Sequence, residues 1–438
     1  MAGNASKYAA GHGNEGAVLH RNAPLLETRV TDPSSTMPFT ESQRAAARRF
    51  AAYAFVDMAG LWLERGWNAA GAHSIERLQA ADLVPAPLGY RRSMAVARQL
   101  FFFAQAWRVT GNPACAARAD ALYADLTGRF WDTQHGGWFF SLGDDGRPAD
   151  DRKDLYGHAF AIFALSHYAA IFNRPAALDW ARRTAEVVKQ HLLLPQGWFA
   201  QAAARDWSTP VAALEQNPHM HLLEAWLALH AAGGDAGALQ DAAQIVRLFS
   251  TRLRSADGTK VLEHFDAVGR PQAETGRLVQ SGHSYEWYWL LHEYAASSGQ
   301  PEYRQIAAPL LTWADRHGVD PLHGGIYDQL DIDGSPTLLR KRIWPVAECI
   351  KAYAIRATAA TDPAGYAALD RWVGFMTTHY FTGPVAGMSG GWHEFLRRDL
   401  QPDSDYLPAT TPYHVAMAAL KVMEAFGDTT LVNSAVPA

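Results

Sequence analysis

The sequence predicts an all-α fold in which helical hairpins form two concentric rings, an (α/α)6 barrel. Apolar residues recur at helical spacing along almost the whole chain. The predicted helices are joined alternately by short and long connections, and the long connections repeat a β-hairpin pattern. A unit of helix, short turn, helix and hairpin loop that is repeated about one axis closes into such a barrel.

Amphipathic or strongly apolar segments mark the predicted helices. The first begins at the capping residue Thr40 and carries Phe50 and Tyr53 among alanines and arginines. The second ends in the sequence GNP, where Gly111 favours termination. The predicted helices cover residues 40–65, 90–109, 113–129, 157–172, 175–191, 218–232, 236–253, 283–298, 301–317, 345–360, 363–379 and 412–426.

Two long connections share one hairpin pattern. Residues 136–148 read GGWFFSLGDDGRP and residues 324–336 read GGIYDQLDIDGSP. Each has a glycine pair, an apolar stretch and an Asp-Gly turn, which is typical of a short β-hairpin. Related residues occur at 263–271 and 390–402. We expect these hairpins at the end of the barrel where the inner helices begin.

Bulk properties narrow the class of protein. No linker divides the 438 residues, so we expect a single barrel domain over residues 36–430 after a flexible, glycine-rich extension over residues 1–35. The net charge of −5, without a basic patch, does not favour a nucleic-acid partner. Cys115 and Cys349 are too few for a disulfide framework, which fits the cytoplasm. No secretory signal, membrane-spanning helix or membrane partner is expected, and a monomer or homodimer is expected.

Polar groups recur at the predicted helix starts. His283 and Glu286 are three residues apart, and Trp287 is one turn from His283, so all three lie on one helix face. His221 and Glu224 repeat the spacing. A helix N-terminus favours neutral imidazole, which can accept a proton near pH 7. Helix capping by the histidine and solvation of the acid remain the alternative interpretation.

Three further helix starts fit the same arrangement. His158 and His414 begin apolar helices, and Glu348 lies one turn after Trp344 and Pro345. If these helices run parallel about one axis, their first turns line one pocket. The sequence therefore predicts a site built from the starts of several inner helices.

Other candidates have two interpretations each. Arg98 lies in an apolar helix, where a guanidinium needs an ion-pair partner or a polar ligand. Trp287, Trp344 and Trp392 lie near helix starts or hairpins, where an indole can pack on a sugar ring or in the core.

The sequence does not support several other site classes. His219 and His221 lack a third ligand at a recognisable spacing, so no metal site is predicted. HEXXH, phosphate-loop and G-x-S-x-G motifs do not occur. Neutral histidines, carboxylates, an arginine and aromatic walls instead suggest proton transfer on a polyhydroxylated substrate. Removing the C2 proton of a sugar aldehyde and returning it to C1 gives the ketose, whereas return to the opposite face of C2 gives the epimer.

A series of motifs resembles the N-acylglucosamine 2-epimerase superfamily, including its mannose isomerase and cellobiose 2-epimerase branches. The motifs occur in order from about residue 40 to 426. They are RQ at 98–99, YxHxF at 156–160, NxxMHxxE at 217–224, GHxxEW at 282–287, WPxxE at 344–348, a GW-containing motif at 391–396 and PYH at 412–414.

The resemblance implies an (α/α)6 barrel and acid/base catalysis through a cis-enediol(ate), without metal or cofactor. His283 and His414 match the catalytic pair, and His158 is a third histidine that assists ring opening or binding. Trp287 and Trp392 are aromatic candidates for sugar binding. The other positions expected to contact or orient the sugar are Arg98, Asn217, His221, Glu224, Glu286, Trp344 and Glu348.

The expected function is aldose–ketose isomerisation of the D-mannose to D-fructose type. The alternative is 2-epimerisation of glucose or mannose, a β-1,4-disaccharide such as cellobiose, or an N-acylhexosamine. The stretch SDYLPATTPYH before His414 departs from the isomerase pattern. A glycoside hydrolase or lyase using Glu286 and Glu348, and a non-catalytic binding barrel, are the remaining alternatives.

Overall fold

The computed structural model describes residues 39–360 and 362–428. The predicted extension over residues 1–35 lies outside the described residues.

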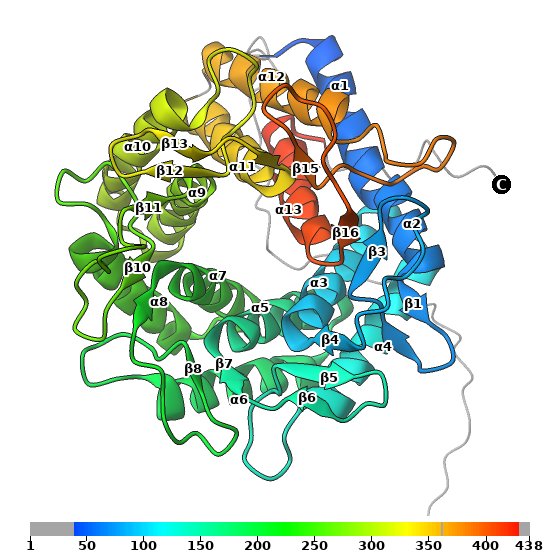
Figure 1. Ribbon diagram of the computed structural model, residues 1–438, viewed down its shortest axis with the longest axis vertical. Coiled ribbons are helices and arrows are strands. Elements are labelled where there is room, and N and C mark those ends of the chain that lie inside the picture. The colour runs from blue at the N-terminus through cyan, green and yellow to red at the C-terminus, as the bar shows by residue number, and fades with distance from the viewer. Residues whose placement is uncertain (1–38, 361, 429–438) are drawn as a thin grey trace, which may run out of the picture. The chain divides into compact units, whose positions relative to one another are not determined.

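Six helices form an inner ring (Figure 1). Each inner helix packs against the next inner helix in chain order, and the last inner helix packs against the first, which closes the ring. Their buried residues are spread around the helix circumference, as expected for helices covered on all sides. The inner helices are α3 (Ser93–Thr110), α5 (Leu155–Phe172), α7 (Gln216–Gly233), α9 (Ser281–Ser298), α11 (Ile343–Ala360) and α13 (Thr411–Ala425).

An outer ring covers the inner one. Its helices are amphipathic, with small or apolar residues facing inward. The outer helices are α1 (Glu41–Ala52) continued by α2 (Met58–Arg65), α4 (Pro113–Asp125), α6 (Pro175–Leu192), α8 (Ala236–Leu248), α10 (Glu302–Trp313) and α12 (Pro363–His379).

The described helices confirm the predicted (α/α)6 barrel. A π-helical turn over Tyr53–Asp57 joins α1 to α2, and similar turns extend α4, α8 and α10 over Leu126–Phe130, Phe249–Leu253 and Ala314–Gly318. With these turns included, every described helix begins and ends within three residues of its predicted range.

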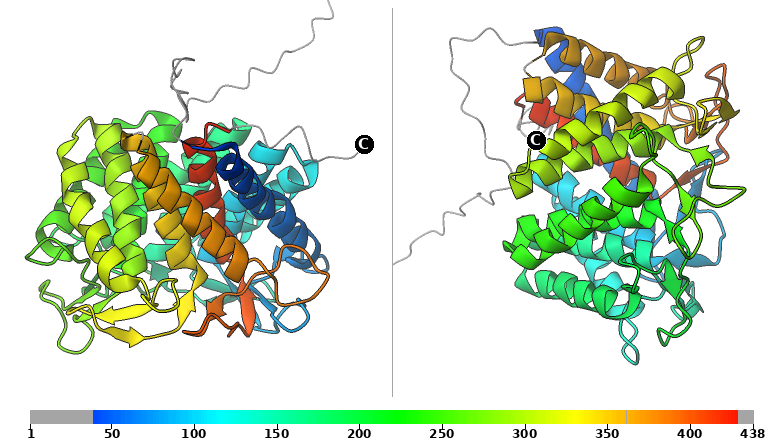
Figure 2. Two further views of the ribbon diagram at one scale, coloured as in Figure 1. Left: turned by 90° about the horizontal axis from the view of Figure 1, so that it is seen from above. Right: turned by 90° about the vertical axis from the view of Figure 1, so that its left-hand side faces the viewer.

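Short strands link neighbouring repeats at one end of the barrel (Figure 2). One strand precedes each inner helix and pairs antiparallel with a strand of the next long connection. The pairs are β4 (Tyr90–Arg92) with β5 (Ser141–Gly143), β7 (Lys153–Asp154) with β8 (Ala202–Ala203), β9 (Leu214–Glu215) with β10 (His264–Phe265), β11 (Leu278–Val279) with β12 (Gln329–Asp331), β14 (Lys341–Arg342) with β15 (Phe395–Leu396), and β16 (Tyr406–Pro408) with β3 (Arg77–Gln79).

The pairing of β16 with β3 joins the last connection to the first, so the strands close the ring as the helices do. The two predicted hairpins are present. They are completed by β6 (Pro148–Asp150) and β13 (Pro336–Leu338), and a further hairpin joins β1 (Trp67–Asn68) to β2 (His73–Ser74).

A lysine follows each of the two predicted hairpins, Lys153 in one repeat and Lys341 in the other, and each forms a buried ion pair. Lys153 Nζ lies 3.1 Å from Asp132 Oδ2. In the equivalent repeat, Lys341 Nζ lies 3.0 Å from Asp320 Oδ2. All four side chains are buried, and paired buried charges avoid most of the desolvation cost of isolated ones. These ion pairs fasten each hairpin to the start of its inner helix.

The helix α5 is long and apolar enough to cross a membrane by length and composition alone, although no such segment was expected. Within the barrel, 72% of it is buried. An inner helix covered by neighbours on every side needs this apolar composition. Cys115 and Cys349 are both buried and free.

Candidate active site

Four inner helices place a polar side chain at the same depth. Arg98, His221, Glu286 and Glu348 are each the sixth residue of their helix. Because these helices begin at the same end of the barrel, equal positions along the helices lie at equal heights. All four side chains are buried. The inner helix α5 contributes Phe160 at this position, and the Phe160 ring lies beneath the Arg98 guanidinium at 4.0 Å.

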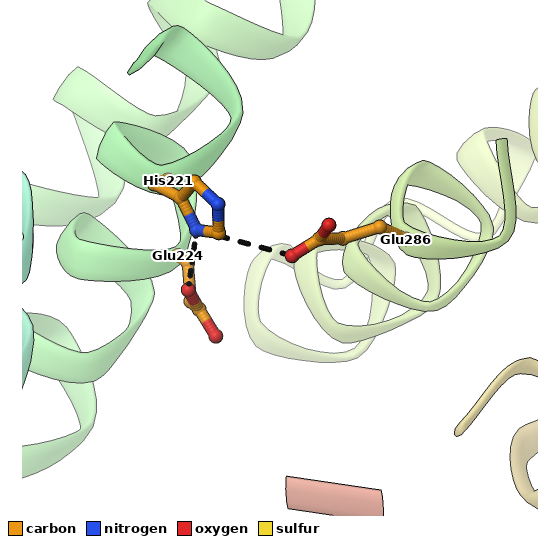
Figure 3. A group of neighbouring side chains, drawn as sticks. All are labelled: His221, Glu224 and Glu286. Atoms are coloured by element: carbon orange, nitrogen blue, oxygen red, sulfur yellow. Dashed lines mark hydrogen bonds and ion pairs between the residues drawn. The ribbon is translucent and has the colours of Figure 1, made fainter. Parts of the chain in front are cut away.

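His221 contacts both Glu224 on its own helix and Glu286 on the neighbouring inner helix (Figure 3). His221 Nδ1 lies 3.0 Å from Glu224 Oε2 and 3.8 Å from Glu286 Oε1. Burial lowers the pKa of His221 well below its usual value, so the imidazole is neutral. Burial raises the pKa of Glu224 to about 7, even though Lys351 and the Tyr413 hydroxyl stabilise its charged form.

Glu286 differs from Glu224 and Glu348 because no hydrogen bond stabilises its carboxyl oxygens within the described residues. It is 1% exposed, and neither of its oxygens has a hydrogen-bond partner among the described residues. Burial raises the pKa of Glu286 well above its usual value, and repulsion from the negative charge of Glu348 adds a smaller effect in the same direction. This shift favours the neutral carboxylic acid, a form that can donate a hydrogen bond.

His414 is held by an anionic carboxylate. Its Nδ1 lies 2.6 Å from Glu348 Oε1, while Lys351 Nζ and Trp289 Nε1 lie 2.6 and 2.9 Å from Glu348 Oε2. Burial alone would raise the pKa of Glu348, but Lys351 and His414 outweigh it and hold this pKa below its usual value. Burial lowers the pKa of His414 to about 3, so its imidazole is neutral at pH 7.

His283 has a comparable partner, although from a different element. Its Nδ1 lies 3.0 and 2.9 Å from the two carboxylate oxygens of Glu263, a residue of the connection before α9. Trp344 lies between the two histidines, with its ring centre 5.0 Å from that of His283 and 5.8 Å from that of His414. Within the described residues, neither histidine has a hydrogen bond to Nε2, so both imidazoles keep one nitrogen available.

A cavity of about 490 Å³ lies at the helix-start end of the barrel. Its lining includes Arg98 and Asn217, and the buried Asn217 Oδ1 atom has no hydrogen-bond partner in the described part of the chain. Neither His283 nor His414 is among the lining residues. Arg98 connects the two regions, because its guanidinium also lies 4.9 Å from the ring of Tyr413, the residue before His414.

The structure places His158 away from this group. Its Nδ1 donates to the carbonyl of Asp154 at 2.7 Å, and its Nε2 accepts from the amide N–H of Trp138 at 3.0 Å. Both ring nitrogens are therefore occupied by the backbone, and burial lowers the pKa of His158 to about 3. This geometry leaves no nitrogen for ring opening or sugar binding, contrary to the expected role. His221 is the third histidine that the structure brings into the group.

Trp287 and Trp392 also differ from the expectation. Both are completely buried. Trp287 stacks on Phe249 with ring centres 4.0 Å apart and donates from Nε1 to Gln216, whereas Trp392 donates from Nε1 to Glu394. With both ring and N–H engaged by protein, these side chains have no face for a sugar.

Two sets of side chains have ligand atoms close enough for a metal ion. They are His221, Glu224 and Glu286, and Glu286, Glu348 and His414, with all atoms of a set within 4.8 Å of one another. However, Lys351 and Arg98 supply positive charge to the same carboxylates. A divalent cation would have to compete with this built-in charge.

Several functional candidates were missed by the sequence analysis. Lys351 is a buried lysine in an apolar helix, so the reasoning applied to Arg98 could have found it. Tyr413 donates to Glu224 from within the quoted PYH motif. Glu263 and Gln216 have no local signal, because only the fold brings them to His283.

Comparison with known proteins gives this site its context. The sequence profile of the N-acylglucosamine 2-epimerase (GlcNAc 2-epimerase) family matches residues 78–418. The chain is 31% identical over 373 residues to a mannose-6-phosphate isomerase of Rhizobium meliloti (strain 1021), covering 82% of this chain and 92% of the relative. It is 30% identical over 348 residues to a D-mannose isomerase of Pseudomonas cannabina pv. alisalensis, covering 75% and 82%.

Solved structures of sugar epimerases and isomerases have the same fold as this chain. A cellobiose 2-epimerase structure from Bacillus thermoamylovorans B4167 superimposes with a TM-score of 0.79 at 20% identity, covering 87% of this chain and 99% of the other. A D-mannose isomerase structure superimposes with a TM-score of 0.75 at 21% identity, covering 89% of this chain and 99% of the other, so the barrel occurs in both a sugar isomerase and a sugar epimerase. The chain belongs to the N-acylglucosamine 2-epimerase family and is an enzyme of the aldose–ketose isomerase or carbohydrate 2-epimerase class.

Proposed function

We propose that the protein isomerises an aldose to its ketose, of the D-mannose to D-fructose type, by proton transfer that needs no metal or cofactor. The observation that carries this proposal is the pair of buried imidazoles, His283 and His414. Each has its Nδ1 against a carboxylate, and its Nε2 has no hydrogen-bond partner among the described residues. We assign catalysis to residues 36–430 as a single domain.

The proposed reaction begins with the open-chain aldose. Nε2 of His283 removes the proton from C2, the C2–H electrons form the C1–C2 double bond, and the carbonyl oxygen takes the negative charge of a cis-enediolate. The resulting imidazolium returns the proton to C1 as the C2 oxygen becomes the ketone, with the O2 proton moving to O1. The neutral carboxyl of Glu286 is suited to that hydroxyl proton, because it can donate one proton and accept another.

Arg98 and Asn217 supply the binding contacts in this proposal. Both line the cavity, and each has a buried polar atom that no described residue satisfies, Arg98 Nε and Asn217 Oδ1. A sugar hydroxyl can satisfy both the donor and the acceptor. Trp344, between the two histidines, offers the aromatic surface against which a sugar ring or chain can lie.

The second candidate is a 2-epimerase, which the presence of two similarly prepared histidines favours. If Nε2 of His414 first takes a proton from water and delivers it to the opposite face of C2, while the His283 imidazolium releases its own proton to water, the product is the C2 epimer. The glycoside hydrolase alternative has less support. Glu348 is engaged by His414, Lys351 and Trp289, so it is not available as a second carboxylate at a glycosidic bond.

The choice of substrates follows from the cavity and the relatives. Arg77, Arg92 and Arg342 also line the cavity, and one relative is named a mannose-6-phosphate isomerase. Guanidinium groups bind phosphate oxygens well. The substrate set therefore includes mannose 6-phosphate beside D-mannose, D-glucose and cellobiose.

The test is a proton NMR time course in deuterated water with enzyme pretreated with EDTA. Fructose formed from mannose, or fructose 6-phosphate from its phosphate, with deuterium at C1 and no early glucose would support the isomerase. Interconversion of C2 epimers without ketose would identify the epimerase. His283→Asn protein, purified in parallel, controls for contaminating isomerases. Activity lost on EDTA treatment and regained with a divalent metal would contradict the metal-independent mechanism.

A further inference from the structure

We propose that Glu263 is a positioning residue that fixes the tautomer of His283, and that Gln216 and Trp287 in turn fix Glu263. The proposal deepens the proposed function, because it concerns the group assigned as the base. The contact itself is independent of substrate and can be tested without turnover.

The tautomer follows from the partner of Nδ1. Both Glu263 oxygens lie within 3.0 Å of His283 Nδ1, and the amide nitrogen Nε2 of Gln216 lies 2.8 Å from the same atom. An ionised carboxylate only accepts hydrogen bonds, and its negative charge outweighs the neutral amide donor of Gln216, so we infer that Nδ1 carries the proton and Nε2 the lone pair. A proton acceptor is therefore created at Nε2. The carboxylate also stabilises the imidazolium that forms when Nε2 takes a proton.

Gln216 holds Glu263 in place. Its Nε2 lies 2.8 Å from Glu263 Oε2, and the amide N–H of Gln280 donates to Glu263 Oε1 at 3.2 Å. Glu263 and Gln216 are 3% and 0% exposed. Donors thus approach both oxygens of a buried side chain, and they hold the carboxyl group in one orientation against His283.

Trp287 sets the orientation of the Gln216 amide. The indole Nε1–H donates to Gln216 Oε1 at 2.8 Å, and this group can only donate. The amide oxygen therefore faces Trp287 and the amide nitrogen faces Glu263. A reversed amide would place an oxygen against the carboxylate. This gives the buried Trp287 a role in orientation, although it contacts no sugar.

The principal variant is Glu263→Gln, which keeps the shape of the side chain and replaces one acceptor oxygen with a donor. We expect kcat/KM on the substrate identified by NMR to fall at least about 100-fold, mostly through kcat, with KM within about threefold. The acidic limb of the pH profile should move. Glu263→Asp should recover part of the loss because it restores the charge. Trp287→Phe should cost less, about 3-fold to 10-fold.

A matched control lies in the same connection. Asp257→Asn makes the same change of charge in an exposed turn between α8 and α9, and we expect it to leave kcat and the pH profile unchanged. Circular dichroism and thermal melting of each variant separate loss of folding from loss of positioning.

Nitrogen-15 NMR of histidine-labelled protein tests the tautomer directly, with the His283 signals assigned by their absence in His283→Asn. Protonated Nδ1 and unprotonated Nε2 in the wild type, with a change in Glu263→Gln, would support the proposal even if every sugar tested is unchanged, and the proposed function would then fail alone. Protonated Nε2 in the wild type, or a folded Glu263→Gln variant with unaltered kcat and pH profile, would overturn it.

Discussion

Two pairs of histidines occupy almost the same place in the repeat but differ in what their nitrogens contact. His158 and His219 each donate from Nδ1 to the carbonyl four residues earlier, and each accepts at Nε2 from a backbone N–H of the preceding connection. His283 and His414 instead have Nδ1 against Glu263 and Glu348, and no hydrogen bond to Nε2 within the described residues.

The difference shows that a histidine at an inner helix start has one of two roles. A backbone-bound imidazole fastens a connection to its helix and has no nitrogen left for chemistry. A carboxylate-bound imidazole has a defined tautomer and an available Nε2, which are the requirements for proton transfer. The hydrogen-bond partner of Nδ1, a backbone carbonyl or a carboxylate, therefore distinguishes the two roles, and the position of the histidine along the helix does not.

The largest expected effect comes from removing an available imidazole. We expect His283→Asn and His414→Asn each to lower kcat/KM by about 10³-fold to 10⁴-fold, because asparagine keeps polarity but cannot exchange a proton near pH 7. Initial rates on the NMR-identified substrate measure this. His158→Asn is the matched comparison, with kcat expected within about threefold of wild type. A loss of kcat in His158→Asn as large as in His414→Asn, in folded protein, would remove the distinction between the pairs.

Glu348→Gln should affect both activity and stability. It leaves Lys351 as a buried cation without its anionic partner, which typically costs about 3–5 kcal/mol, and it removes the support of His414, for which we expect about a 100-fold loss of kcat. Urea unfolding and initial rates measure the two effects. Adding Lys351→Met should recover stability but not activity. Recovery of both would mean that Glu348 acts only as the counter-charge of Lys351.

The backbone-bound pair should matter for stability alone. His158→Ala leaves the Trp138 N–H and the Asp154 carbonyl without their partners, and buried unsatisfied groups cost about 1–3 kcal/mol each. We therefore expect the free energy of unfolding to fall by about 2–5 kcal/mol, with the equivalent result for His219→Ala. Denaturant titration at pH 7.5 provides the measurement. A change below about 0.5 kcal/mol would show that the hydrogen bonds to the backbone contribute little.

The smallest effect concerns acid stability. Burial lowers the pKa of His158 to about 3 and of His219 to about 4, below about 6.5 for unfolded histidine. Their stabilisation is thus complete above pH 6.5 and is lost as pH falls toward 3 to 4, because the unfolded chain binds more protons. Glu224, whose pKa burial raises to about 7, has the opposite trend between pH 4.5 and 7.

Four histidines described above have a lowered pKa, namely His158, His219, His221 and His414, against two carboxyl groups of the site with a raised pKa, Glu224 and Glu286. We therefore expect the melting temperature to fall on acidification below pH 6.5. The fall should be shallower in His158→Gln than in the wild type. Thermal melts from pH 4.5 to 8 compare the two proteins, and parallel curves would contradict the shift of the His158 pKa.

The sequence by itself determined the helices, the hairpins and the barrel. Helical periodicity and turn residues are local properties, so the helix limits could be read to within three residues. It also identified His283, His414, Glu286 and Glu348 as candidates, because polar groups in apolar helix starts are visible as exceptions to the pattern.

Only the tertiary structure separated His158 from His221 and removed Trp287 and Trp392 from the sugar-binding candidates. These roles depend on which atoms face a side chain across the barrel. Glu263 reaches His283 from 20 residues away and Glu348 reaches His414 from 66 residues away. Hydrogen bonds between distant segments have no periodicity along the chain, and they form only when the ring closes.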